Sequence, residues 1–435
     1  KIKMTIIKEK QEDLITQILT KTKDKEYKST KFRELENVVK DYITKQQTTQ
    51  ALDSLTLWSQ NLWSSDIHFD NRVEDTIVRF RIDWVLVDIM SLSKKEYKLL
   101  LERIKHSSHL KLNITNIPQD WKYEINIDEN KIDVRVSTLP TNYWENVVCR
   151  VLDSKKAIVD FDNLWFYWTT KRILEKAINK KNWMILITWP TGSGKTTTLY
   201  TMLSKLNTRD KKLVTLEDPI EYKLEWVIQS EVNEKNNYTY DLWLKALLRQ
   251  DPDIIMVWEI RDYDTLSIAT QASLTGHLVL STLHTKSAWE TLDRIINMWL
   301  KPYILASAID TIIAQRLVRQ ICPECKQQKE KTPEEEKIIK QMMIEIWMKN
   351  VDIDYTHLYE WAWCENCNNS WYKWRIWVYE IISFNNNLRD MIREWENVAE
   401  IIDSARKNDM ITMKEDWILK ALKWYTTIKE VLRVL

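Results

Sequence analysis

Apolar and polar residues alternate in the first third of the chain, and this pattern predicts half-buried strands. Four such runs lie at 66–70, 77–82, 124–127 and 132–136. Residues 95–106 have helical spacing, and Asp128-Glu129-Asn130 separates the last two runs as the turn of a hairpin. We therefore predict an α+β domain over residues 54–153.

Continuous apolar runs replace this alternation further along the chain. They lie at 184–188, 213–216, 254–257 and 278–281. Short runs of this kind are typical of strands buried on both faces. A helix is predicted over 196–206, directly after the first run, so strands and helices alternate. The pattern predicts an α/β domain over residues 154–320, with a mostly parallel sheet and its ligand at the carboxyl ends of the strands.

The two ends of the chain have weaker patterns. Residues 1–53 are highly charged and predict a helical linker, with a disordered tail as the alternative. Because Lys1 is not an initiator residue, we interpret this stretch as the remnant of a truncated N-terminal region. Residues 381–435 predict small C-terminal helices. No apolar run approaches the roughly 18 residues that a membrane span needs.

A phosphate-binding loop follows the first buried strand. The run Trp189-Pro190-Thr191-Gly192-Ser193-Gly194-Lys195-Thr196 fits the P-loop pattern except at its first position, where glycine is expected. A strand before it and a helix after it are the required context. Backbone N–H groups from Trp189 to Thr197 would cradle the phosphates of ATP, and Lys195 would add a positive point charge. The Thr196 hydroxyl would bind Mg²⁺.

The mismatch at Trp189 belongs to a wider anomaly in composition. The chain has 3 Gly and 23 Trp. The two counts together approach the roughly 30 glycines expected at about 7%. Pairs such as Asp83-Trp84, Asp120-Trp121, Lys373-Trp374 and Asp416-Trp417 put Trp where turns use glycine. We interpret most of these tryptophans as glycines, encoded by UGA in an organism that reads UGA as glycine. The alternative is a Trp-rich protein with an aromatic surface.

Acidic and histidine residues follow the other buried strands. Glu259 comes just after 254–257, where a carboxylate can activate water or help to hold Mg²⁺ in a P-loop enzyme. Glu217 and Asp218 end the strand at 213–216 and form a second acidic candidate. His277 and His284 bracket the strand at 278–281, and each is as compatible with a structural role as with a catalytic one.

Four cysteines form two C-x-x-C pairs, Cys322/Cys325 and Cys364/Cys367. This spacing predicts a structural Zn²⁺ site, because four thiolates leave no open position for water. A helical insertion over 333–348 would bridge the gap, and the zinc-binding module would span 321–380. The fifth cysteine, Cys149, is predicted to lie in a core. The formal net charge of +1 argues against nucleic acid as an obligatory partner.

These motifs together resemble the ATPases of type II secretion and type IV pilus assembly, over about residues 55–435. The resemblance is carried by the segments 65–68, 81–83, 133–140, 191–200, 216–222, 249–262 and 274–285 and by the four cysteines. It implies a RecA-like P-loop domain preceded by a PAS-like α+β domain. The zinc module is similar to that of the assembly (extension) ATPases and unlike the retraction ATPases.

The resemblance also implies residue roles. Glu259 would be the catalytic glutamate with Glu217 in support, and His284 would belong to the family's histidine motif. Arg135 and Arg150 would contact the phosphates from the α+β domain. Where this chain has Trp, the family has Gly at several positions, among them 63, 84, 121, 144, 189, 258, 299, 371, 374 and 377.

The resemblance implies a homohexamer in the cytoplasm, at the cytoplasmic face of the inner membrane. It would pass motion to an inner-membrane platform protein, with membrane contact through such partners, and would power assembly of a pilus or secretion pseudopilus. Two other functions stay open. One is a DNA-translocating or conjugative ATPase of the same superfamily, and the other is a catalytically inactive scaffold, if the tryptophans are genuine.

Overall fold

The fold is taken from a computed structural model. It describes residues 26–82, 85–127, 130–153, 159–166, 168–188, 194–232, 240–330, 333, 336, 358–361, 364, 367, 371–394, 398–408, 410–423, 425–427 and 430. Several predicted segments lie outside this range: residues 1–25 of the linker, the pair at 83–84, the turn residues 128–129, the first five P-loop residues (189–193) and most of the insertion at 333–348. The chain forms two compact units, built mainly from residues 1–154 and from residues 155–362 with 372–435.

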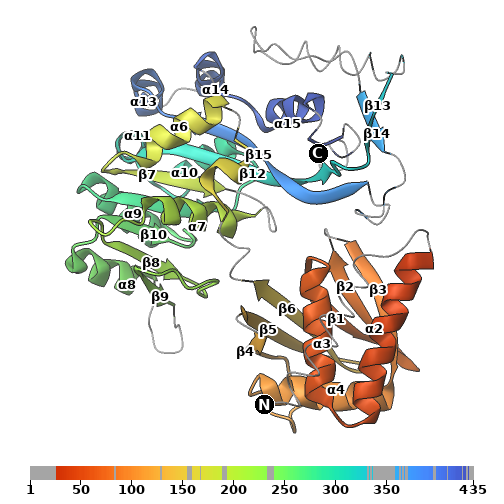
Figure 1. The fold of residues 1–435 in the computed structure, drawn as a ribbon. Coiled ribbons are helices and arrows are strands. Elements are labelled where there is room, and N and C mark those ends of the chain that lie inside the picture. Colours follow the sequence, from red (N-terminus) through yellow and green to blue (C-terminus); the bar gives the residue numbers. More distant parts are fainter. Residues whose placement is uncertain are drawn as a thin grey trace. The chain divides into compact units, whose positions relative to one another are not determined.

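The first unit is a six-stranded antiparallel sheet with three helices packed against it (Figure 1). The strand order is β3-β2-β1-β6-β5-β4. Alternation along each strand separates the faces, because Ile67 and Phe69 are fully buried against the helices and Asp66 and His68 lie on the other face. The elements are α2 (Glu26–Thr44), α3 (Thr48–Asn61), β1 (Ser64–Asn71), β2 (Asp75–Ile82), β3 (Val85–Ser93), α4 (Lys94–Ser107), β4 (Gln119–Ile127), β5 (Asn130–Thr141) and β6 (Trp144–Asp153).

The structure differs from the prediction of a linker over residues 1–53 in the part of this stretch that it describes. Helix α2 and the start of α3 contribute Leu35, Val39, Ile43 and Leu52 to the core of the first unit. The apolar positions of α2 recur every four residues, which is the spacing of one helix face. Among the described residues of α2, the charged side chains of Arg33 and Asp41 are exposed to solvent.

The second unit contains a seven-stranded sheet in the order β15-β12-β7-β11-β10-β8-β9, parallel except for β15. The predicted α/β pattern is confirmed. The strands are β7 (Trp183–Thr188), β8 (Leu213–Glu217), β9 (Val227–Glu231), β10 (Ile254–Val257), β11 (Leu278–Leu283), β12 (Ile309–Ile321) and β15 (Tyr372–Ser383). A separate antiparallel pair joins β13 (Lys326–Lys329) to β14 (Leu358–Trp361).

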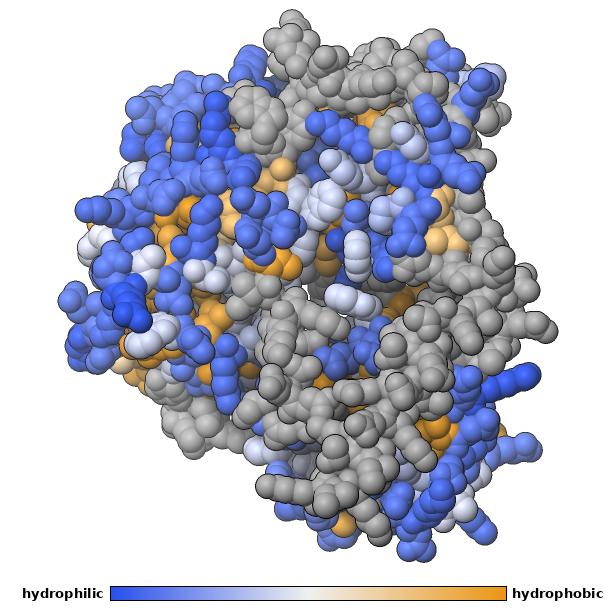
Figure 2. All heavy atoms as spheres, viewed as in Figure 1, coloured by the Kyte–Doolittle hydropathy of each residue, from blue (hydrophilic) through white to orange (hydrophobic). Residues whose placement is uncertain are grey.

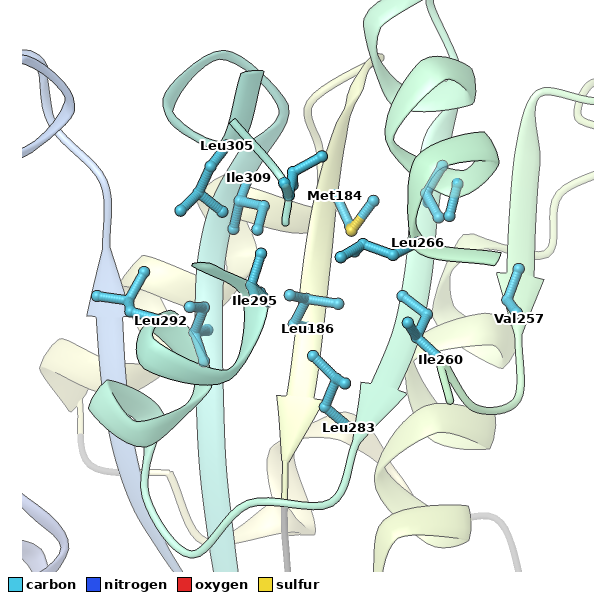
Figure 3. Packing of buried hydrophobic residues seen from close by; sticks show 14 of the residues in the cluster. Met184, Leu186, Val257, Ile260, Leu266, Leu283, Leu292, Ile295, Leu305 and Ile309 are labelled. Atoms are coloured by element: carbon cyan, nitrogen blue, oxygen red, sulfur yellow. The ribbon is translucent and has the colours of Figure 1, made fainter. Parts of the chain in front are cut away.

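Both faces of this sheet are covered by helices, which is why its strands are continuously apolar. Met184 and Leu186 of β7 point into a core with α8–α11 and α13 (Figure 3), whereas Ile185 and Ile187 pack on the opposite face with η1, α6 and α7. The helices are η1 (Phe161–Leu164), α6 (Trp168–Ile178), α7 (Lys195–Leu206), α8 (Tyr240–Leu247), η3 (Leu248–Gln250), α9 (Tyr263–Leu274), α10 (Ala288–Asn297) and α11 (Pro302–Ala308).

The C-terminal helices predicted for the end of the chain are α13 (Asn386–Arg393), α14 (Val398–Lys407) and α15 (Met413–Leu422). Helix α15 packs on β15 through Trp417 and Ala421. In the same helix, Asp416 accepts a hydrogen bond from the backbone N–H of Tyr379 on β15 at 2.8 Å and pairs with Lys420 at 2.6 Å. This buried pair fixes the helix to the edge strand of the sheet.

Candidate active site

Four parallel strands end at one edge of the seven-stranded sheet, and each leads to a predicted site residue. Strand β7 runs into the P-loop, β8 ends on Glu217, β10 is followed by Glu259 after one residue, and β11 is followed by His284. Their registers are aligned, because β7 pairs with β11, β11 with β10 and β10 with β8 as parallel neighbours. The side chains therefore gather where parallel sheets bind ligands.

The described part of the P-loop is its transition into helix α7. Gly194 caps the helix with φ 80°, a left-handed conformation that favours glycine. Lys195 is the first helical residue, and Thr196 and Thr197 lie half-buried in the first turn. Burial lowers the pKa of Lys195, while the negative charges of Glu259 and Glu221 act in the opposite direction. The helix N-terminus and this lysine can hold phosphate together.

Glu259 is the centre of a charged cluster at this edge. Its side chain is 12% exposed, and one carboxylate oxygen lies 2.9 Å from Nε of Arg261. The other oxygen lies 3.3 Å from Nε2 of His284. Arg261 also reaches Asp218, with Nη1 and Oδ2 3.3 Å apart. Glu259 and His284, predicted separately from two strands, are thus brought together.

Arg261 was missed by the sequence analysis, and Asp218 was only noted beside Glu217. A signal for Arg261 was present, because it lies two residues beyond Glu259 in Glu259-Ile260-Arg261. Ile260 is buried in the core between them, so that Glu259 and Arg261 point to the same side. The pair presents a carboxylate next to a cation 2.9 Å away, which orients the carboxylate.

Glu217 lies below the surface of the site. It is fully buried and accepts hydrogen bonds from the Thr215 hydroxyl at 2.6 Å, from Nε2 of Gln229 at 2.9 Å and from the Tyr200 hydroxyl. Burial raises the pKa of Glu217, and the hydrogen bonds oppose that rise. The carboxylate oxygens of Glu217 therefore accept hydrogen bonds from uncharged side chains within the protein.

The two histidines that bracket β11 have different surroundings. Nδ1 of His277 lies 3.0 Å from the carbonyl oxygen of Ala272 and 3.3 Å from the Thr275 hydroxyl, at the end of helix α9. These contacts suit a residue that ends a helix. His284, by contrast, faces Glu259.

Arg135 and Arg150 lie directly opposite each other on β5 and β6 of the first unit. Arg150 is 61% exposed, and its Nε lies 2.9 Å from Oδ1 of Asp66. Asp66 is almost fully buried, and its other oxygen lies 3.5 Å from Nε of Arg81. The buried carboxylate of Asp66 therefore orients Arg81 and Arg150 on the polar face of this sheet.

The four cysteines of the predicted zinc module form one cluster. Cys322, Cys325, Cys364 and Cys367 are all buried, and their sulfur atoms lie within 4.8 Å of one another. Sulfur ligands at about 2.3 Å around one tetrahedral ion lie slightly closer together than this, so the arrangement fits a single metal ion after a small contraction. Cys149 is a fully buried core residue of the first unit, as predicted.

Two tryptophan rings lie against the P-loop helix. Nζ of Lys195 is 4.8 Å from the centre of the Trp258 ring. A Cβ atom built on Gly194 would lie 2.6 Å from Nε1 of Trp377, and this indole nitrogen is buried without a hydrogen-bond partner. These rings occupy space next to the residues predicted to hold phosphate.

Comparison with known proteins agrees with this geometry. The family model described as "Type II/IV secretion system protein" matches residues 47–433. The type II secretion system protein E of Aeromonas hydrophila is 39% identical over 375 residues, which is 85% of this chain and 72% of that protein. The type IV pilus assembly ATPase PilB of Pseudomonas aeruginosa is 38% identical over 85% of this chain and 64% of its own.

Solved structures show the same fold. The ATPase DotB of Legionella pneumophila has a TM-score of 0.64 and 19% identity, covering 88% of this chain and 94% of that one. The fold and the cluster at the strand ends define a P-loop nucleotide hydrolase. The chain belongs to the type II/IV secretion system protein family, and it is a secretion or pilus-assembly ATPase.

Proposed function

We propose that the chain is the motor subunit of a homohexamer that hydrolyses ATP to power assembly of a type IV pilus or a type II secretion pseudopilus. Family membership supports the motor class. Head-to-tail contacts between copies usually close into rings. In this proposal the ring works in the cytoplasm and passes its motion to a platform protein in the inner membrane.

The chemistry assigns one task to each group at the strand ends. The backbone of 189–197 and Lys195 hold the ATP phosphates, and the Thr196 hydroxyl holds Mg²⁺, which neutralises phosphate charge when bound. Glu259 takes the proton of the attacking water, and His284 and Arg261 fix its orientation. Arg135 and Arg150 supply further positive charge to the transferring phosphate in the completed site.

The observation that carries the proposal is the position of Glu259. It lies at the carboxyl edge of the sheet, just after β10, and only β11 separates β10 from β7, the strand that leads into the P-loop. Its carboxylate lies 2.9 Å from Arg261 and 3.3 Å from His284. A carboxylate that is held by two side chains beside a phosphate-binding lysine is placed to orient and deprotonate water.

Glu259→Gln tests this role in protein that carries glycine at the positions predicted to be recoded. The variant should bind ATP normally and turn it over at least about 10²-fold more slowly, because the general base is lost. Glu225→Gln, at an exposed position of the same unit, is the control. A turnover rate in Glu259→Gln equal to that of the unmodified protein would remove Glu259 from the mechanism.

The proposal assigns one structural Zn²⁺ to the four cysteines and no obligatory nucleic acid to the motor. The balanced charge of the chain supports the second point. In the part of the chain that the structure describes, no helix is both long and apolar enough to cross a membrane. On the face shown in Figure 2, the described residues are mostly hydrophilic, with hydrophobic residues in scattered groups. Membrane contact through a partner protein is consistent with this surface.

A further inference from the structure

A buried polar network lies directly beneath the charged cluster. Its centre is the carboxylate of Glu217, which is fully buried at the end of β8. Three hydrogen-bond donors surround it, from three different elements: Tyr200 on α7, Thr215 on β8 and Gln229 on β9. A fully buried carboxylate is costly unless such donors satisfy it, so the network constrains all three elements.

The same side chains hold the loop 218–224, which is the first part of the connection from β8 to β9. Gln229 donates from Nε2 to the carbonyl oxygen of Tyr222 at 2.8 Å and accepts from the backbone N–H of Leu224 at 2.7 Å. The backbone N–H of Tyr222 lies 3.4 Å from the Tyr200 hydroxyl, and the two rings meet edge to face with centres 5.7 Å apart. The network therefore ties this loop to the P-loop helix.

The loop also contributes to the charged cluster above it. Asp218 pairs with Arg261, which in turn pairs with Glu259. The negative charge of Glu221 acts to raise the pKa of Lys195, against the effect of burial. A shift of the loop would therefore move the carboxylates of Asp218 and Glu221 relative to Lys195 and Glu259.

We propose that Tyr200 and Gln229 are positioning residues, which act through Glu217 to hold the loop 218–224, and with it Asp218 and Glu221, in register with the P-loop helix. In this arrangement Glu217 serves as a buried hydrogen-bond acceptor and does not touch water or phosphate. The inference deepens the proposed function and rests on Glu259 being the catalytic base.

The first test measures how often the loop 218–224 opens in the absence of nucleotide. Lys223 is an exposed residue within it, so trypsin cleavage after Lys223 reports how often the loop opens. Tyr200→Phe removes only the hydroxyl, and we expect cleavage at Lys223 to become about 10-fold faster, the scale of one hydrogen bond to a charged group. Tyr379→Phe is the matched control, because it also removes one buried hydroxyl, which donates to the carbonyl oxygen of Leu164 outside the loop instead of to Glu217. It should leave cleavage unchanged.

The second test separates positioning from base catalysis. Tyr200→Phe should lower kcat about 10-fold with KM for MgATP within about twofold, because the loop matters most in the transition state. Glu217→Gln keeps the shape and most hydrogen bonds, so kcat should fall by less than about threefold, whereas Glu217→Ala should match or exceed the loss in Tyr200→Phe. A Glu217→Gln loss of about 10²-fold would overturn the proposal in favour of a direct role for the carboxylate.

The outcomes distinguish this inference from the proposed function. If the protein does not hydrolyse ATP, or Glu259→Gln is fully active, the proposed function fails, while the cleavage assay still reads the loop. If Tyr200→Phe matches Tyr379→Phe in both cleavage at Lys223 and kcat, the inference fails, whatever Glu259 does.

Discussion

Several single residues occupy backbone conformations that favour glycine. Among the described residues, eleven that are not glycine have positive φ, and eight of these are tryptophans, at positions 63, 144, 165, 183, 226, 299, 371 and 374. Left-handed backbone costs an L side chain about 1–2 kcal/mol, so eight such sites approach a typical folding stability of about 5–15 kcal/mol. This backbone pattern supports the interpretation that most tryptophans are recoded glycines.

That interpretation predicts UGA at most of the 23 Trp codons and glycine in peptides from the native organism. Sequencing the gene and mass spectrometry of the native protein check it. Three pairs named in the sequence analysis do not lie in turns, since Trp121 is in β4, Trp374 is in β15 and Trp417 is inside α15. The decisive positions are Trp189 and Trp258, where UGG codons would overturn the interpretation and leave an inactive scaffold as the better reading.

A stability measurement tests the same residue-scale argument on the chain as written. Trp299 has φ 67° and is 85% exposed, so it has strain and little packing to lose. Trp299→Gly should raise the free energy of unfolding by about 1 kcal/mol. Trp58→Gly, inside helix α3, should lower it by at least about 1 kcal/mol. Equal destabilisation by both changes in urea unfolding would contradict the strain argument.

Arg150 is the residue through which the first unit is predicted to act on phosphate. Its Nε is held by Asp66 and its side chain is 61% exposed, which leaves the guanidinium accessible. Arg150→Ala should lower kcat more than it weakens ATP binding, because the contact tightens in the transition state. Arg79→Ala, which removes a neighbouring arginine paired with Asp70, is the control. Weaker ATP affinity with unchanged kcat would contradict this role.

At the scale of elements, strands β12 and β15 form a ribbon that leaves the sheet. Strand β7 pairs with β12 only from Ile309 to Ala314, whereas β15 continues along β12 to Ile321. Cys322 follows directly after this end. A two-stranded ribbon is marginally stable alone, so a metal ion held by the cysteines would close its free end.

We expect one equivalent of Zn²⁺ per chain and its loss in Cys322→Ser. Amide exchange should then accelerate at 317–321 and 372–376 before it changes in β7 or α7, because the ribbon end loses its clamp. Cys149→Ala, in the core of the first unit, should keep the metal. Less than half an equivalent of zinc in protein with intact thiols would rule out the site.

The elements that could be predicted are those whose pattern is set locally. Strands buried on both faces, such as 213–216 and 254–257, have continuous apolar runs. The carboxyl edge that β10 and β11 share places Glu259 beside His284, a contact that the sequence analysis did not predict. The hydrogen bonds of Glu217 could not all be predicted, because two of its three donors, Tyr200 and Gln229, lie on other elements. Arg261 was missed although Glu259 lies two residues away, because its second partner, Asp218, comes close only when β8 and β10 pair.

For the molecule as a whole, buried acids set a pH dependence of stability. Burial raises the pKa of Glu217, Glu380 and Asp416 above the ordinary values for these side chains. The folded state then binds more protons than the unfolded state between the ordinary and the raised pKa, so stability falls as pH rises through that window. Thermal unfolding from about pH 4.5 to 7 should show this slope, and Glu217→Gln should flatten it. An unchanged slope in that variant would contradict the pKa assignment.

The motor proposal makes its strongest demand on assembly and on partners. With MgATP, the particle mass should approach six times the chain mass of 52.4 kDa, measurable by analytical ultracentrifugation, because a head-to-tail interface that closes gives a ring of defined size. A DNA-translocating ATPase would also form a ring, so mass alone does not separate the two functions. The effect of DNA on ATP hydrolysis separates them. In a pilus or pseudopilus motor, the hydrolysis rate should stay the same within about twofold when duplex or single-stranded DNA is added. The measurement is made at low salt, where electrostatic binding of DNA is strongest. Stimulation by DNA that disappears as salt is raised would favour the translocating function, and a monomer at micromolar concentration with MgATP would contradict the ring.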